Sequence, residues 1–279
     1  MARQTQRVLI TGGNRGIGAA MAENLLWKGY RVTVICRDIE KAELFLREMK
    51  SMGLTGIDYI RGDLGSMESI RVTESLIREQ SPLFSHFIHN AGIWPVRKVL
   101  NPDGLEQSFV TNHLAPFMLN HLLEDIFLKN KCRIIQISAG LYPLGMKNFK
   151  ATATGDNFSI LRTYASTKFL NLVTTMRFAE KWKGTGVVIN AIHPGVVRTG
   201  LGEMRGLPGL VMKLAKHFCL SPAEGAEAPV NLAVNTRFEG TSGVYFDRFK
   251  PAELRPMALD REFINGVWNQ AMSLCNFPA

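Results

Sequence analysis

Tyr164 and Lys168 offer a phenol and an ammonium group at a spacing that suits proton chemistry. On a helix, residues four positions apart lie on one face, so the ammonium can approach the phenol. A nearby cation favours the phenolate and would bring the pKa of the tyrosine, ordinarily about 10, closer to neutrality. The pair could therefore act as a general acid or base, or it could be a solvated surface pair.

A second candidate site is the glycine-rich stretch VLITGGNRGIG, which lies between an apolar run and a helical pattern. Glycines there permit a tight turn and let backbone amides at the helix start approach a pyrophosphate. An ordinary glycine turn is the alternative, but the position of the stretch in the first strand–helix unit favours nucleotide binding. The residues expected to contact the nucleotide are Gly12, Asn14, Arg15, Gly16, Ile17 and Gly18.

The end of the second apolar run, VICRD, indicates which nucleotide is bound. A carboxylate at this point would bind a ribose hydroxyl, whereas an arginine accepts a 2′-phosphate. Arg37, together with Arg15 in the glycine loop, therefore favours NADP(H) over NAD(H) through charge-assisted contacts. Asp38 could serve a ribose hydroxyl or cap the next helix, and we expect the cap.

The elements that must position these groups alternate between apolar runs and helical patterns. This alternation predicts an α/β fold, a doubly wound parallel sheet of about seven strands with helices on both faces. The expected strands are 7–11, 31–37, 57–64, 84–92, 132–140, 186–195 and 240–247. The expected helices are 16–30, 39–53, 66–80 with Ser66 as its cap, 109–130, and one running on from Tyr164.

Composition narrows the class of protein. The 279 residues, 46% of them hydrophobic, suffice for a single domain spanning 1–279. We expect no transmembrane segment and no signal peptide, and four cysteines without paired spacing favour a reducing, cytoplasmic location. The sequence contains no Cys/His cluster of the kind that would predict a metal site, so we expect none. The net charge of +9 could attract an anionic ligand, but no dense basic run is interleaved with aromatic residues, so nucleic acid is not an expected partner.

Taken together, the motifs resemble those of the short-chain dehydrogenase/reductase family over nearly the whole chain. They are TGGNRGIG (11–18), GDL (62–64), HNAG (89–92), TNHLAPF (111–117), IIQISAG (134–140), YASTK (164–168) and HPGVVRTGL (193–201). Gly13 stands where alanine is common in the family, and Thr167 where serine is common. The run ICRDIEKAE (35–43) and the long interval from Ser138 to Tyr164 are most similar to the retinol-dehydrogenase-like, NADP-dependent carbonyl reductases.

This resemblance implies a single Rossmann-type domain and roles for individual residues. Ser138 would hydrogen-bond the substrate oxygen, Tyr164 would transfer the proton, and Lys168 would hold the nicotinamide ribose and lower the pKa of the tyrosine. Asn112 would support the lysine through a water. The remaining cofactor contacts would be Asp63 and Leu64 at the adenine, Asn90, Ala91 and Gly92 at the adenosine ribose, Tyr164 beside the nicotinamide, and Pro194, Gly195, Val197 and Thr199 at its carboxamide. His89 and His193 would be structural, and helices 109–130 and 164–183 would form a homodimer or homotetramer.

Two segments, 141–163 and 199–222, fit the alternation of strands and helices poorly, and we expect them to determine substrate specificity. The second is punctuated by glycine and then apolar, which predicts a substrate lid; a membrane-touching helix or a packed helix is the alternative. The expected lining of the pocket is Tyr142, Leu144, Leu201, Met204 and Leu207. We therefore expect an oxidoreductase acting on a hydrophobic ketone, aldehyde or alcohol. The competing interpretations are a non-catalytic NADP(H)-sensing module and a nucleotide-sugar epimerase or dehydratase.

Overall fold

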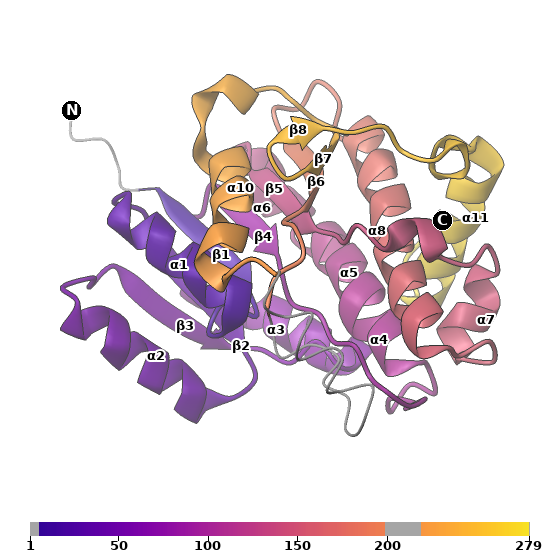
Figure 1. The fold of residues 1–279 in the computed structure, drawn as a ribbon, viewed down its shortest axis with the longest axis horizontal. Helices are drawn as coiled ribbons and strands as arrows, with labels where there is room; N and C mark the ends of the chain where they lie inside the picture. The colour runs from indigo at the N-terminus through magenta and orange to yellow at the C-terminus, as the bar shows by residue number, and fades with distance from the viewer. Residues whose placement is uncertain (1–5, 199–218, 279) are drawn as a thin grey trace.

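An eight-stranded sheet forms the centre of the computed structural model, which describes residues 6–198 and 219–278 (Figure 1). The strand order is β3-β2-β1-β4-β5-β6-β7-β8, and the strands β1 to β7 pair in parallel. The last strand, β8 (Lys250–Pro251), pairs antiparallel with β7 (Tyr245–Asp247). The predicted α/β class and parallel sheet are confirmed. The eighth strand was not predicted, because two residues carry no periodicity.

The order of the strands reverses at β1: β2 and β3 are added on one side of it, and β4 and the later strands on the other. The other strands are β1 (Arg7–Thr11), β2 (Arg31–Cys36), β3 (Ile57–Arg61), β4 (His86–His89), β5 (Arg133–Ile137) and β6 (Val188–His193). In open parallel sheets, ligands bind in the crevice beyond the carboxyl ends of the strands at such a switch point. The glycine loop follows β1 and Asn90 follows β4, so both lie at this crevice.

Helices cover the two faces of the sheet because successive strand residues point to opposite sides. Val8 and Ile10 of β1 pack in one apolar cluster, whereas Leu9 packs in the other. The first cluster lies under α1 (Gly16–Trp27), α2 (Ile39–Ser51) and α10 (Pro222–Val234). The second lies under α3 (Met67–Gln80), α5 (Ala115–Leu122), α6 (Glu124–Asn130), α8 (Ile160–Lys181) and α11 (Arg261–Leu274). Figure 1 shows α11 beside α7 and α8.

Two of the helix starts are capped as the sequence predicts. Asp38 precedes α2 and accepts a hydrogen bond from the backbone amide of Lys41 at 3.1 Å. Ser66 precedes α3 and forms a capping box with Ser69, in which each side chain accepts from the other residue's backbone amide. Such caps satisfy amides that would otherwise lack a partner in the first turn.

The long helix expected at 109–130 is wrong as a continuous element. The chain instead forms α4 (Gln107–Phe109), a π-helical turn η1 (Val110–Leu114), α5 and α6. The helical run continues through the π-helical turn and α5, and Leu123 separates α5 from α6. Pro116, in the first turn of α5, has no amide hydrogen to donate to the carbonyl of Asn112 four residues earlier. A π-helical turn within a helix is often found at a functional site.

The segment 141–163, which fits the alternation poorly, is partly helical. It contains a short 3₁₀ turn, η2 (Tyr142–Leu144), and helix α7 (Phe149–Thr154). Helix α8 begins at Ile160, so Tyr164 lies in its second turn rather than at its start. The remaining short turns are η4 (Thr236–Phe238) and η5 (Pro256–Leu259). Across the described residues, no helix combines the length and apolarity needed to cross a membrane.

Candidate active site

Tyr164, Lys168 and Ser138 come together where α8 crosses the carboxyl end of β5. The Lys168 Nζ donates a hydrogen bond of 3.0 Å to the carbonyl of Ile137, the last residue of β5. Ser138 follows directly, and its Oγ donates to the Lys168 carbonyl at 3.4 Å. The Lys168 Nζ also lies 5.8 Å from the centre of the Tyr164 ring. The structure therefore places the three candidate catalytic groups side by side.

Burial sets the protonation of this pair. Tyr164 is 8% exposed, and its burial raises the pKa of the phenol to about 12. Burial disfavours the charged form of each group, so it likewise lowers the pKa of the Lys168 ammonium, to about 8. The expected lowering of the tyrosine pKa by Lys168 is therefore not what the protein alone produces. At neutral pH the phenol is protonated and the lysine is mostly a cation.

The Asn112 side chain forms hydrogen bonds to both the segment after β4 and helix α8. Its side chain accepts from the Ile93 amide at 2.8 Å and donates to the Ile93 carbonyl at 2.9 Å. It also donates to Thr167 Oγ1 at 3.1 Å, and that hydroxyl donates to the Tyr164 carbonyl. The side chain thus fixes the segment after β4 against α8. The lysine support through a water, which the family resemblance implied, stays a prediction.

The backbone carbonyl of Asn112, which Pro116 leaves without a helical partner, is satisfied by a residue that the sequence analysis missed. Asn171, one turn beyond Lys168 on α8, donates from Nδ2 to this carbonyl at 2.7 Å. Its Oδ1 lies 3.3 Å from His113 Nδ1. A proline four residues after a polar helix residue was the available signal, because it leaves a carbonyl that some donor must satisfy.

The glycine loop has the conformation that its sequence requires. Gly12 and Gly16 have φ of +64° and +54°, a region that glycine adopts without steric cost. A Cβ at Gly18 would lie 2.2 Å from the Gly12 carbonyl oxygen, so only glycine lets helix and loop approach this closely. Gly13 is similarly constrained, since its Cβ would lie 2.6 Å from Val34 Cγ1. This contact gives a local reason for glycine where the family commonly has alanine.

Asn90 braces the glycine loop from the neighbouring strand. Its Nδ2 donates to the carbonyls of Thr11 at 3.0 Å and Gly12 at 3.1 Å. The amides of Asn90 and Ala91 both donate to Thr11 Oγ1 at 3.0 Å. Gly92 lies close to two of the candidate catalytic side chains, since a Cβ there would lie 3.4 Å from Asn112 Oδ1 and 3.5 Å from Lys168 Nζ. The HNAG motif therefore lies between the glycine loop and α8, which carries Tyr164 and Lys168.

The start of α1 fits an anionic group. Arg15 occupies the N-cap position, but its side chain does not cap the helix. The first turn, all of which the structure describes, carries no acidic residue. The first amides of α1 are therefore left for an external acceptor, and the helix dipole favours a negative charge there. Exposed Arg15 adds a positive charge at the same point, while Asn14 and Ile17 are half-buried in the loop. These features suit a pyrophosphate.

The residues after β2 suit an additional phosphate. Asp38 is engaged as the cap of α2 and in an ion pair with Lys41 Nζ at 2.5 Å. Arg37 is exposed, and its contact with Asp63 is long, at 4.0 Å. Leu64, next to Asp63, is buried. Asp38 is thus committed elsewhere, whereas the guanidinium of Arg37 is available at the surface.

The segment after β6 is held by Leu220. The Arg198 amide donates to the Leu220 carbonyl at 2.9 Å, and the Leu220 amide donates to Val196 at 2.8 Å. Gly195 has φ of +97°, and a Cβ there would lie 2.6 Å from Leu220 Cδ1. Val197 packs against Gly225 on α10, whose Cβ would lie 2.4 Å from a Val197 methyl. Pro194 begins this segment, and the predicted contact Thr199 lies outside the described residues.

The predicted substrate pocket is only partly within the described residues, because Leu201, Met204 and Leu207 lie outside them. Tyr142 is buried, with its ring centroid 6.3 Å from that of Phe169 and 5.3 Å from that of Tyr245. Leu144 is exposed at a pocket of about 530 Å³.

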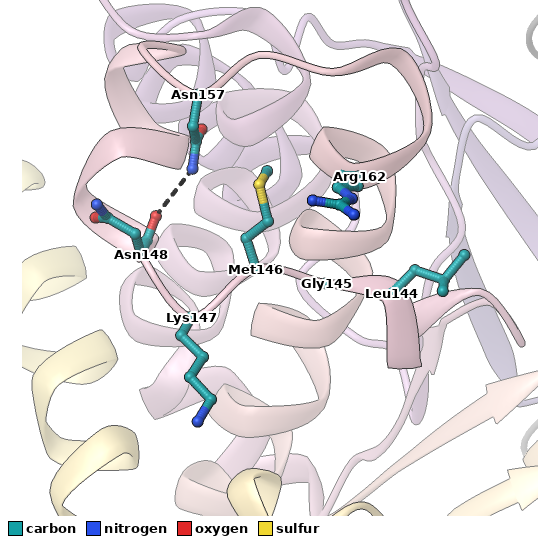
Figure 2. Close-up of a pocket in the computed structure, with 7 residues that line it drawn as sticks. All are labelled: Leu144, Gly145, Met146, Lys147, Asn148, Asn157 and Arg162. Carbon is teal, nitrogen blue, oxygen red and sulfur yellow. Dashed lines mark hydrogen bonds between the residues drawn. The ribbon is translucent and has the colours of Figure 1, made fainter.

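This pocket lies between the segment after η2 and the first turn of α8. Its lining consists of Leu144, Gly145, Met146, Lys147, Asn148, Asn157 and Arg162 (Figure 2). Met146 points to the side of Asn157, and Lys147 points to the opposite side of the segment. Leu144 and Met146 thus give the pocket an apolar part, and Arg162 gives it a cation.

Of the two histidines in the candidate cofactor motifs, His89 is buried and His193 is half-buried. Burial lowers the pKa of His89 to about 4, and its Nε2 lies 2.9 Å from Asn120 Oδ1. Burial also lowers the pKa of His193, at the end of β6. Among the residues that the structure describes, no group of three or more His, Cys, Asp or Glu side chains could hold a metal ion.

Comparisons with known proteins show the family to which the chain is similar. The family described as short chain dehydrogenase matches residues 6–206. Retinol dehydrogenase 14 from Homo sapiens is 34% identical over 282 residues, which cover 94% of this chain and 84% of that protein. Retinol dehydrogenase 13 from Homo sapiens is 31% identical over 281 residues, with coverage of 98% and 85%.

Solved structures show the same fold. An uncharacterised protein from Mycobacterium paratuberculosis superposes with a TM-score of 0.76 at 23% identity, covering 98% of this chain and 95% of that chain. A short chain dehydrogenase from Salmonella enterica superposes with a TM-score of 0.68 at 20% identity, covering 88% and 97%. At these identities the likeness speaks for the fold alone, since one fold can host many functions.

Proposed function

The chain belongs to the short-chain dehydrogenase family, and from this premise we propose that it is an NADP(H)-dependent oxidoreductase interconverting a hydrophobic carbonyl compound and its alcohol. The observation that carries the proposal is the junction of Ser138, Tyr164 and Lys168 at the end of β5, beside a glycine loop shaped for a pyrophosphate. A module that only senses the nucleotide would not need a buried phenol and ammonium at this junction.

The side chains have distinct tasks in the proposed reaction. The nicotinamide, when bound, would supply the hydride in reduction and accept it in oxidation. Ser138 Oγ would release its long hydrogen bond to the Lys168 carbonyl and donate to the substrate oxygen. Tyr164, protonated at neutral pH, would give its proton to that oxygen in reduction and recover it in oxidation. The Lys168 ammonium would stabilise the phenolate left behind.

The proposed preference for NADP(H) rests on Arg37, because Asp38 is already engaged with Lys41. Replacing Arg37 with alanine should weaken NADPH binding by about ten- to a hundred-fold, the range for losing one charge-assisted contact of about 1.5–3 kcal/mol. NADH binding should change little, because NADH lacks the 2′-phosphate. Fluorescence titration of both cofactors measures the two affinities.

Arg47→Ala on the exposed face of α2 is the matched control, since it removes the same charge from the same neighbourhood. It should leave the affinity for both cofactors close to that of the parent. Equal losses of NADPH and NADH affinity in Arg37→Ala would rule out the 2′-phosphate contact.

The proposed substrate class rests on the names of the relatives, which are retinol dehydrogenases. A panel of retinal, other bulky hydrophobic aldehydes and ketones, and small polar carbonyl compounds should show NADPH oxidation with the bulky members. Absorbance at the NADPH band is the measurement. If no member turns over in either direction while NADPH still binds, the non-catalytic sensing module becomes the better interpretation.

A further inference from the structure

Trp94 lies flat against the phenol of Tyr164. The two ring centroids are 4.4 Å apart and the ring planes differ by 12°. The indole is half-buried, and its Nε1 donates a hydrogen bond of 2.6 Å to the carbonyl of Ile160. Ile160 is the first residue of α8 and lies one turn before Tyr164. The indole is therefore hydrogen-bonded to the helix that carries the phenol, one turn before it.

The segment that carries Trp94 is held on both sides of the indole. Ile93 lies immediately before it. The Ile93 amide donates a hydrogen bond to the Asn112 side chain, and the Ile93 carbonyl accepts one from it. Pro95, immediately after it, restricts the backbone of Trp94 to extended conformations. Although residues 90–99 form no helix or strand, the indole thus has little freedom to leave the phenol.

We propose that Trp94 is a positioning residue, which fixes the orientation of the Tyr164 phenol and shields one face of it from water. The inference rests on the proposed function, because it assigns Trp94 a task in the proton transfer of Tyr164. A phenol held between the indole and its own helix has few rotamers open to it, so its hydroxyl keeps one direction. The indole also removes the water that would otherwise stabilise a phenolate.

The charges around the phenol are consistent with shielding by a neutral ring. Burial alone accounts for the raised pKa of Tyr164, although the Lys168 ammonium lies 5.8 Å from the ring centre. Arg162, on the preceding turn of α8, is exposed at the pocket shown in Figure 2. Arg97 and Lys98, on the segment after Trp94, are exposed as well. Removing the indole should therefore change the hydration of the phenol without removing a charge.

The test compares Trp94→Leu with Trp94→Phe by the absorbance of ionised tyrosine. The signal of Tyr164 is the difference between each protein and the same protein carrying Tyr164→Phe, measured from neutrality to about pH 10.5 without cofactor or substrate. We expect no Tyr164 ionisation in the parent chain over this range. Trp94→Leu should lower the midpoint by about one unit or more, so that ionisation becomes visible. Trp94→Phe, which retains an aromatic ring but lacks the indole N–H, should stay closer to the parent.

Trp27→Leu is the matched control, since it removes an exposed indole from the far end of α1 and should leave the Tyr164 titration unchanged. Circular dichroism confirms folding at each pH. A Tyr164 titration in folded Trp94→Leu that matches the parent would overturn the proposal, even if the variant were less stable. With an active substrate, Trp94→Leu should also lower kcat more than it changes KM, with rescue by Trp94→Phe. Absence of turnover in the parent would overturn the proposed function but leave the titration result to stand.

Discussion

Tyr164→Phe should lower kcat by about a hundred- to ten-thousand-fold, the usual contribution of a positioned general acid or base. The substitution removes one oxygen and leaves the ring to stack on Trp94, so the packing of the site is kept. NADPH affinity should fall much less, because the glycine loop and Arg37 lie on other elements. The loss should therefore appear in kcat rather than in cofactor binding.

The measurement pairs steady-state NADPH oxidation with a cofactor titration on the same protein. Tyr245→Phe is the matched control, because it removes the same oxygen from another buried phenol, in β7. It should retain activity near that of the parent. A Tyr164→Phe protein that kept its kcat would show that the proton comes from another group.

The pH dependence of the parent enzyme follows from the same pKa shifts. Because burial raises the pKa of Tyr164 to about 12, the phenol is in the acid form needed for reduction across the neutral range. Oxidation needs the phenolate, so its rate should rise with pH through the alkaline range. Lys168, with a pKa lowered to about 8, loses its charge above that value, and reduction should weaken there.

Much of the fold could be predicted because the strands that carry the site are fully buried. Val8, Ile10 and Val34 face one helix layer, while Leu9 and Ile35 face the other, so β1 and β2 appear as continuous apolar runs. The caps at Asp38 and Ser66 were also predictable, because a polar residue directly before an amphipathic run has few other uses.

The irregular parts of the site depend on contacts between distant residues, which periodicity does not report. Pro116 cannot donate to the carbonyl of Asn112, and Asn171 satisfies this carbonyl from another helix. The direction of the Tyr164 pKa shift depends on how completely Trp94 and its neighbours cover the phenol. A charge at the correct spacing predicts only the electrostatic contribution of Lys168, and here burial outweighs it.

Gly18→Ala should weaken NADPH binding by more than about tenfold and also lower the stability of the protein. Gly18 lies within α1, where alanine would ordinarily be favoured over glycine by about 1 kcal/mol. The new Cβ would, however, lie 2.2 Å from the Gly12 carbonyl oxygen and 2.6 Å from Asn90 Nδ2. Neither atom can yield alone, because Asn90 also holds the carbonyls of Thr11 and Gly12.

The clash must therefore move the glycine loop away from the start of α1, where the pyrophosphate is proposed to bind. Overpacking of this kind costs about 1–3 kcal/mol, which should lower the melting temperature by several degrees. Thermal unfolding followed by circular dichroism and a NADPH titration on the folded protein measure the two effects separately. Gly56→Ala is the matched control, since its Cβ would meet neighbours only at 3.5 Å and beyond. NADPH affinity unchanged in Gly18→Ala would mean that the cofactor does not depend on the close approach of the loop to α1.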